Sequence, residues 1–89
     1  MKKINNNINI KTLIQQGNNI KQTGSTITRY DTTEIEKLIC SSLSFLESEE
    51  LEYTNQYKEL RFLLDNFNND ETHYNRIMGA LLSCEQMYF

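Results

Sequence analysis

The chain has 89 residues, of which 38% are hydrophobic and 24% charged, and this composition suits one small globular domain, residues 1–89, with a single core. Proline is absent and glycine occurs three times, which disfavours a turn-rich β-sandwich or barrel and predicts an all-α fold. The net charge of −3 is uneven, because residues 1–29 hold five basic side chains and no acid, whereas residues 31–57 hold seven acids and one lysine. No aromatic residue interleaves the basic segment, so direct nucleic-acid binding is not expected.

The beginning of the sequence does not read as a signal peptide, since Met1-Lys2-Lys3 is followed by asparagines, and no apolar run approaches about 18 residues. We therefore expect a cytoplasmic protein that does not enter membranes. Cys40 and Cys84 lie within apolar helical patterns and lack the paired spacing of a zinc or redox site. Both are predicted to be buried free thiols, and no metal or cofactor is expected.

Residues 1–7, rich in asparagine, are predicted to form a flexible tail. A first helix is predicted from Asn9 to about Gln22, because the apolar residues fall on one face: Ile10, Leu13, Ile14 and Ile20. Residues 23–30 follow as a loop with at most one short extended segment near residues 25–30, since β-branched side chains are frequent there.

A second helix is predicted to begin at Thr32, because Asp31 and Glu34 form a capping-box pattern ahead of an apolar repeat. It is expected to end in the acidic run 47–52, since acids at a helix C-terminus oppose the helix dipole. The third helix is predicted to begin near Ser48, whose hydroxyl can cap it. Its amphipathic face holds Tyr53, Tyr57, Leu60, Leu64 and Phe67.

The last helix is predicted to run from Glu71 to about Tyr88, with turn chemistry and an N-cap supplied by Asn68, Asn69 and Asp70. It forms an antiparallel hairpin with the third helix in a compact bundle of three to four helices. Residues 77–89 contain only three polar positions, Ser83, Glu85 and Gln86. Such a helix is predicted to have no solvated face and more apolar surface than this chain can cover, which favours self-association or partner binding.

An anion-binding site is one interpretation of five residues: Arg29, Tyr57, Arg61, His73 and Arg76. Guanidinium forks beside tyrosine faces suit a nucleotide phosphate held between protomers. The alternative is that Arg61 and Arg76 form ion pairs with Glu59, Asp65 or Glu71. His73 is the only histidine, and the sequence fixes no nucleophile or carboxylate beside it, so no catalytic or metal role is predicted.

A strip on the last helix is the predicted partner or oligomer interface: Arg76, Gly79, Ala80 and Ser83. Small side chains let another backbone approach closely, as in a symmetric dimer seam, and the alternative is contact with the first or second helix. The closing residues Met87, Tyr88 and Phe89 are either a frayed end or an aromatic anchor in a partner's groove.

Four acids form a predicted acidic patch between the second and third helices: Glu47, Glu49, Glu50 and Glu52. One interpretation is a solvated bend. The other is a decoy that occupies the arginine-rich nucleic-acid groove of another protein through complementary charge.

The segments IKTLIQQGNNI (10–20), RYDTTE (29–34) and LSFL (43–46) resemble the helical leading segments of some bacterial phage-defence proteins. The short chain, its asparagine and lysine bias and its lack of a catalytic signature also resemble small phage and prophage proteins that inhibit host defence. That resemblance implies a non-enzymatic inhibitor that binds stoichiometrically to a host protein in the host cytoplasm. The alternative is an oligomeric sponge for an anionic nucleotide. Helical phage sponges share the hairpin format, but none of their binding residues can be matched here.

Overall fold

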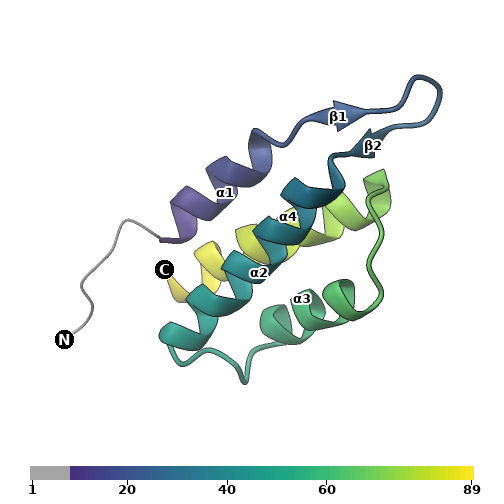
Figure 1. Ribbon diagram of the computed structural model, residues 1–89. Helices are drawn as coiled ribbons and strands as arrows, with labels where there is room; N and C mark the ends of the chain where they lie inside the picture. The colour runs from purple at the N-terminus through teal and green to yellow at the C-terminus, as the bar shows by residue number, and fades with distance from the viewer. Residues whose placement is uncertain (1–8) are drawn as a thin grey trace.

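The computed structural model describes residues 9–89, which form four helices and one two-stranded antiparallel ribbon (Figure 1). The predicted tail, residues 1–7, lies outside the described residues. The fold is mostly helical, as predicted, although it is not purely α. The elements in chain order are α1 (Ile10–Asn18), β1 (Gln22–Thr23), β2 (Arg29–Tyr30), α2 (Thr32–Ser48), α3 (Asn55–Asp65) and α4 (Glu71–Tyr88).

The ribbon between α1 and α2 corrects the all-α prediction. Gln22 pairs with Tyr30 and Thr23 pairs with Arg29, so two short strands form where at most one extended segment was expected. Gly24 turns the chain with a φ of 88°, in the left-handed region that glycine adopts without strain. Local β propensity therefore predicted extended backbone here, but it did not indicate that the segment would pair with residues before the turn.

The starts of α1 and α2 are confirmed. The Asn9 side chain accepts a hydrogen bond from the Thr12 backbone N–H (2.9 Å), and the Asp31 side chain accepts one from the Glu34 N–H (3.0 Å). Both caps satisfy backbone donors that the first helical turn leaves unpaired. α1 ends at Asn18, earlier than the predicted Gln22, because glycine and two asparagines of low helix propensity follow one another at positions 17–19.

The start predicted for α3 is wrong. Ser48 is the last residue of α2 and its hydroxyl donates to the Phe45 carbonyl (2.7 Å), so it does not cap a new helix. α2 closes with a Schellman motif, in which the Leu51 N–H donates to the Leu46 carbonyl (2.8 Å) and Glu50 takes a positive φ of 60°. Thr54 caps α3 instead, so the acids after Ser48 lie in a connecting loop and not in a helical first turn.

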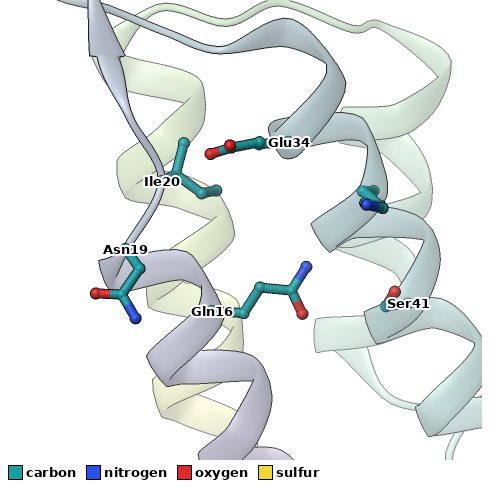
Figure 2. Close-up of a pocket in the computed structure, with 6 residues that line it drawn as sticks. Gln16, Asn19, Ile20, Glu34 and Ser41 are labelled. Carbon is teal, nitrogen blue, oxygen red and sulfur yellow. The ribbon is translucent and has the colours of Figure 1, made fainter.

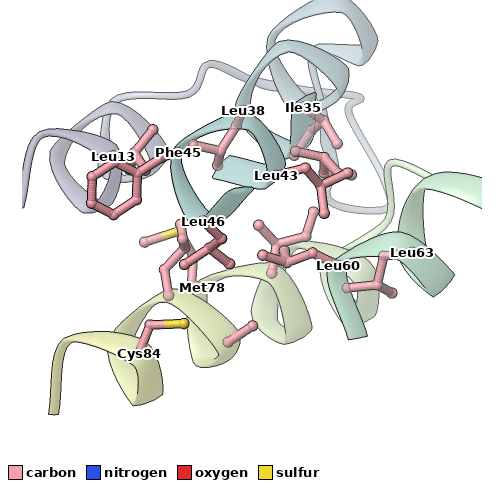
Figure 3. Close-up of a cluster of buried hydrophobic side chains, with 14 of the residues drawn as sticks. Leu13, Ile35, Leu38, Leu43, Phe45, Leu46, Leu60, Leu63, Met78 and Cys84 are labelled. Atoms are coloured by element: carbon pink, nitrogen blue, oxygen red, sulfur yellow. The ribbon is translucent and has the colours of Figure 1, made fainter. Parts of the chain in front are cut away.

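α4 begins at Glu71 with Asp70 as its N-cap, as predicted. It runs antiparallel to α3, since Glu59 meets Arg76 while Gln56, earlier on α3, meets Ser83, later on α4. Each helix packs against the next along the chain, and α1 packs against α4, so the four helices surround one core. Figure 3 shows side chains of all four helices meeting there; the fully buried apolar residues are Leu13, Ile35, Leu38, Ile39, Leu46, Leu60, Leu63, Ile77, Leu81 and Cys84.

The prediction that the last helix has no solvated face is wrong. The neighbouring helices bury one side of α4, whereas Asn75, Gly79 and Gln86 lie exposed on the other. Only Leu82, at 50% exposure, and Met87, at 62%, leave large apolar area uncovered within the helix. Among residues 9–89, no helix combines the length and the hydropathy that crossing a bilayer needs.

The two cysteines differ. Cys84 is fully buried, as predicted, but Cys40 is exposed on the outer side of α2. Cys40 follows Leu38 and Ile39 directly, and at 100° per residue this step carries it off the core-facing stripe. Its apolar neighbours in the sequence therefore gave no measure of its own burial.

Candidate interaction surface

The three arginines of the predicted anion site each have a different partner. Arg29 donates to the Asn68 side chain (3.4 Å), and Arg61 pairs with Asp65 one helical turn later at 4.0 Å. Arg76 forms a two-point contact with the Glu59 carboxylate (2.7 and 3.0 Å). This carboxylate occupies the guanidinium fork that an anion would need and raises the pKa of Arg76. Within one protomer the structure does not bring the three arginines to a common pocket.

Tyr57 and His73 are also engaged inside the fold. The Tyr57 hydroxyl donates to Glu47 (2.6 Å), and this bond, followed by burial and nearby carboxylates, raises the pKa of Tyr57. The His73 ring contacts the Asn66 carbonyl through Nε2 (2.8 Å) and faces Asp70 through Nδ1 (3.5 Å). These contacts tie the end of α3 to the first turn of α4, which is a structural role. Groups of three or more metal-ligating side chains are absent from residues 9–89.

The predicted interface strip forms one wall of a groove between α3 and α4. Arg76, Gly79, Ala80 and Ser83 come from α4, and the opposite wall holds Asn55, Gln56 and Glu59; the volume is about 360 Å³. The strip therefore faces α3, and neither α1 nor α2 as the alternative had it. Gln56 donates to the Ser83 hydroxyl (2.8 Å), and Ala80 is only 7% exposed. A side chain at Gly79 would meet no atom within 4 Å, so the groove is open above that residue.

Two exposed apolar side chains stand at the ends of this α3–α4 groove. At one end Phe62 is 48% exposed, with the Arg76 guanidinium 5.4 Å from its ring centre. At the other end the Met87 sulfur lies 3.3 Å from the Gln56 amide and 3.7 Å from the Ser83 hydroxyl. The groove thus has one wall of small residues, which lies between two exposed apolar side chains, Phe62 and Met87. The strip of small residues was visible in the sequence, but the apolar side chains at its ends come together with it only when α3 and α4 pack.

The predicted acidic patch lies at one end of the molecule, together with the end of α4. Phe89 packs on Phe45 near the end of α2 (ring centres 5.4 Å apart), and its N–H donates to Glu85, so the closing residues continue the helix and are not frayed. This end of the molecule holds three exposed apolar side chains, two of them from the closing residues, and four acids. We call this set the end face: Tyr53, Met87, Phe89, Glu47, Glu49, Glu50 and Glu52.

A further hollow, of about 530 Å³, lies between α1 and α2 (Figure 2). Its lining is mainly polar: Gln16, Asn19, Ile20, Glu34, Lys37 and Ser41. The Glu34 carboxylate accepts a hydrogen bond from the Lys21 backbone N–H (3.1 Å), which links the start of α2 to the segment between α1 and the ribbon. The sequence did not indicate this feature, because its polar positions read as the ordinary solvated sides of two amphipathic helices.

Comparisons with protein-family models, with curated proteins and with solved structures found no match to this chain.

Proposed function

We propose that this protein is a non-enzymatic binding protein, a phage or mobile-element inhibitor that acts by stoichiometric binding to a host protein. The observation that carries the proposal is the α3–α4 groove, which is open above Gly79 and has exposed Phe62 and Met87 at its ends. A wall of small residues admits a partner's backbone, and apolar side chains at both ends supply the contacts that dominate binding energy at protein interfaces.

The states of His73 and Cys84 support binding over turnover. His73 is held by the Asn66 carbonyl and Asp70. Cys84 is buried, and burial raises the pKa of its thiol to about 11, which makes the nucleophilic thiolate scarce at neutral pH. Both groups stabilise the fold in ways that leave them unsuited to attack a substrate.

The test is a pull-down from host lysate, with and without nuclease, followed by mass spectrometry of captured proteins and small molecules. Gly79→Leu fills the groove where the fold offers free space, so it blocks a partner without disturbing the core. Ser44→Leu places the same leucine side chain at an exposed position of α2 outside the groove and is the matched control.

We expect wild type and Ser44→Leu to capture the same host protein in amounts close to one per protomer, with or without nuclease, and Gly79→Leu to lose it. Light scattering on the purified proteins separates this outcome from self-association, because a dimer seam in the groove would make Gly79→Leu alone monomeric. Equal capture by both variants contradicts the groove as the binding site. Recovery of a nucleotide in place of a protein would favour the sponge.

A further inference from the structure

We propose that the end face binds a lysine- or arginine-rich amphipathic segment of a partner protein. Apolar side chains of that segment pack on Tyr53, Met87 and Phe89, and its cations meet the surrounding glutamates. The inference rests on the proposed function only in taking the partner to be a protein. The end face and the α3–α4 groove share Met87, but Gly79 belongs to the groove alone, and Glu50 and Glu52 belong to the end face alone.

The apolar part of the end face is exposed, and two of its three side chains, Met87 and Phe89, are held in place. Tyr53 is 69% exposed, Met87 62% and Phe89 53%. Phe89 is held against Phe45, and Met87 is held by the amide of Gln56 in the first turn of α3. Ordered aromatic and methionine side chains lose little conformational entropy on binding, so they act as pre-organised anchors. The other exposed large apolar residues among those described are scattered: Ile27, Phe62, Phe67 and Leu82.

The charge of the end face is negative and largely unpaired. Among residues 9–89, Glu49, Glu50 and Glu52 have no ion pair, and Glu47 accepts only the Tyr57 hydroxyl. Lys11, which reaches the end of α4, is already bound to Glu85 at 2.9 Å. α2 and α4 both end here, so the partial negative charge of two helix C-termini adds to that of the carboxylates.

The pKa of Tyr57 responds to the carboxylates of the end face. This pKa is raised first by the hydrogen bond to Glu47 and then by burial; the charges of Glu47 and Glu52 act in the same direction, and the charge of Arg61 opposes them without reversing the shift. A carboxylate at the end of α2 and one in the α2–α3 connection therefore act at one place. Figure 1 shows the connection, the start of α1 and the end of α4 at the same end of the bundle.

This charge decides between the classes of occupant. Nucleic acid and anionic lipid surfaces are repelled by it. A second copy of the chain meeting this face symmetrically would place two sets of four carboxylates against each other, which costs free energy. A neutral apolar peptide would cover Tyr53 and Met87 but would desolvate the neighbouring carboxylates without compensation. A cationic segment with an apolar side satisfies both parts of the face.

The experiment uses synthetic peptides as probes. Calorimetry measures binding of a 14-residue amphipathic helix of leucine and lysine to the full chain, with a leucine and glutamate helix and an oligolysine of equal length as comparisons. We expect only the leucine and lysine helix to bind measurably, and we expect its binding to weaken as salt rises from about 0.05 to 0.5 M.

Paired variants locate the contact. Glu50→Gln with Glu52→Gln should weaken binding roughly 2- to 30-fold, the combined effect of two exposed ion pairs. The control, Glu36→Gln with Glu71→Gln, removes the same charge from exposed acids elsewhere and should leave the affinity within about twofold. Met87→Ser should weaken binding, and Ile27→Ser should not, although both side chains are 62% exposed in the native fold.

Equal weakening by both glutamine pairs would reduce the effect to net charge and overturn the proposal. So would equal binding of oligolysine, or equal effects of Met87→Ser and Ile27→Ser. Gly79→Leu should bind the peptide as wild type does. If Gly79→Leu loses host-protein capture but still binds the peptide, the two surfaces act separately. A failure of one proposal can therefore be distinguished from a failure of the other.

Discussion

The two sides of α4 contrast sharply. Toward α1 the packing is closed: the Met78 side chain lies against Gly17, and the Tyr74 hydroxyl donates to the Gly17 carbonyl (2.9 Å). Toward α3 the contact is mainly polar, through Arg76 and Ser83, and space is left above Gly79. Glycine thus has a different role on each side: Gly17 of α1 permits close contact with α4, whereas Gly79 of α4 lies in an open groove. The first side contributes stability, and the second is available for a partner.

The largest expected effect tests how far the closed packing extends through α4. Leu81 is fully buried and its neighbour Leu82 is 50% exposed. Leu81→Ala should lower the free energy of unfolding by about 2–5 kcal/mol, because it removes apolar burial and leaves a cavity. Leu82→Ala removes the same atoms from a half-solvated position and should cost much less. Urea denaturation of both variants measures the difference, and similar losses would mean that Leu82 is covered in solution.

The sequence predicts this inside-outside pattern well where the signal is local. The caps Asp31 and Asp70 fix the starts of α2 and α4, because each side chain bonds to a backbone N–H three residues later. The core stripe of α2 follows the helical period for the same local reason. Ser48 and Thr54 show the limit, since either hydroxyl can cap a helix and only the Schellman closure around Glu50 decides between them.

The candidate surfaces depend on contacts between elements, and the sequence does not specify those. The strip with Gly79 was recognisable, but the groove exists because α3 supplies the opposite wall. Arg76 could have held an anion, and Glu59 occupies it only because the antiparallel pairing places the two side chains together. Cys40 lies one residue past the core stripe, so a rotation of 100° decides its exposure.

Replacing Gly17 or Gly79 by alanine tests the difference between the two sides of α4 directly. A Cβ at Gly17 would clash with the Met78 sulfur and lie 3.2 Å from Leu38, whereas one at Gly79 would touch nothing within 4 Å. Both variants gain about 1 kcal/mol of helix propensity, so that term cancels between them. The remaining difference, with Gly79→Ala the more stable, should be about 1–3 kcal/mol from overpacking at Gly17.

Parallel denaturation curves of the two alanine variants and wild type provide the measurement. Gly79→Ala should exceed wild type in stability and keep the wild-type circular dichroism spectrum. Equal stability of the two variants would mean that Met78 moves aside without cost, and the α1 side of the helix would then be less tightly packed than the structure indicates.

A pH effect of intermediate size follows from Cys84. Burial raises the pKa of its thiol from 9.0 to about 11, so above pH 9 the unfolded chain releases this proton before the folded chain does. The stability from Cys84 is complete below pH 9 and is lost between pH 9 and 11, at up to about 1.4 kcal/mol per pH unit. The fall in unfolding free energy from pH 8 to 10 should shrink in Cys84→Ala and persist in Cys40→Ala, whose thiol is exposed.

The smallest effects concern the ion pair on each side of α4, Lys11–Glu85 toward α1 and Arg76–Glu59 toward α3. Lys11 makes a single contact from a side chain that is 82% exposed, whereas Arg76 holds Glu59 at two points above the Phe62 ring. Glu59→Gln should therefore lower the melting temperature more than Glu85→Gln, because a two-point contact orders fewer free rotamers per bond. In 0.5 M NaCl the difference in melting temperature between the two variants should narrow if that difference is electrostatic. A difference in melting temperature that persists at high salt would instead assign the effect to the contact of Arg76 with the Phe62 ring. In that case Phe62, at the end of the groove, would be what orders the α3 side of α4.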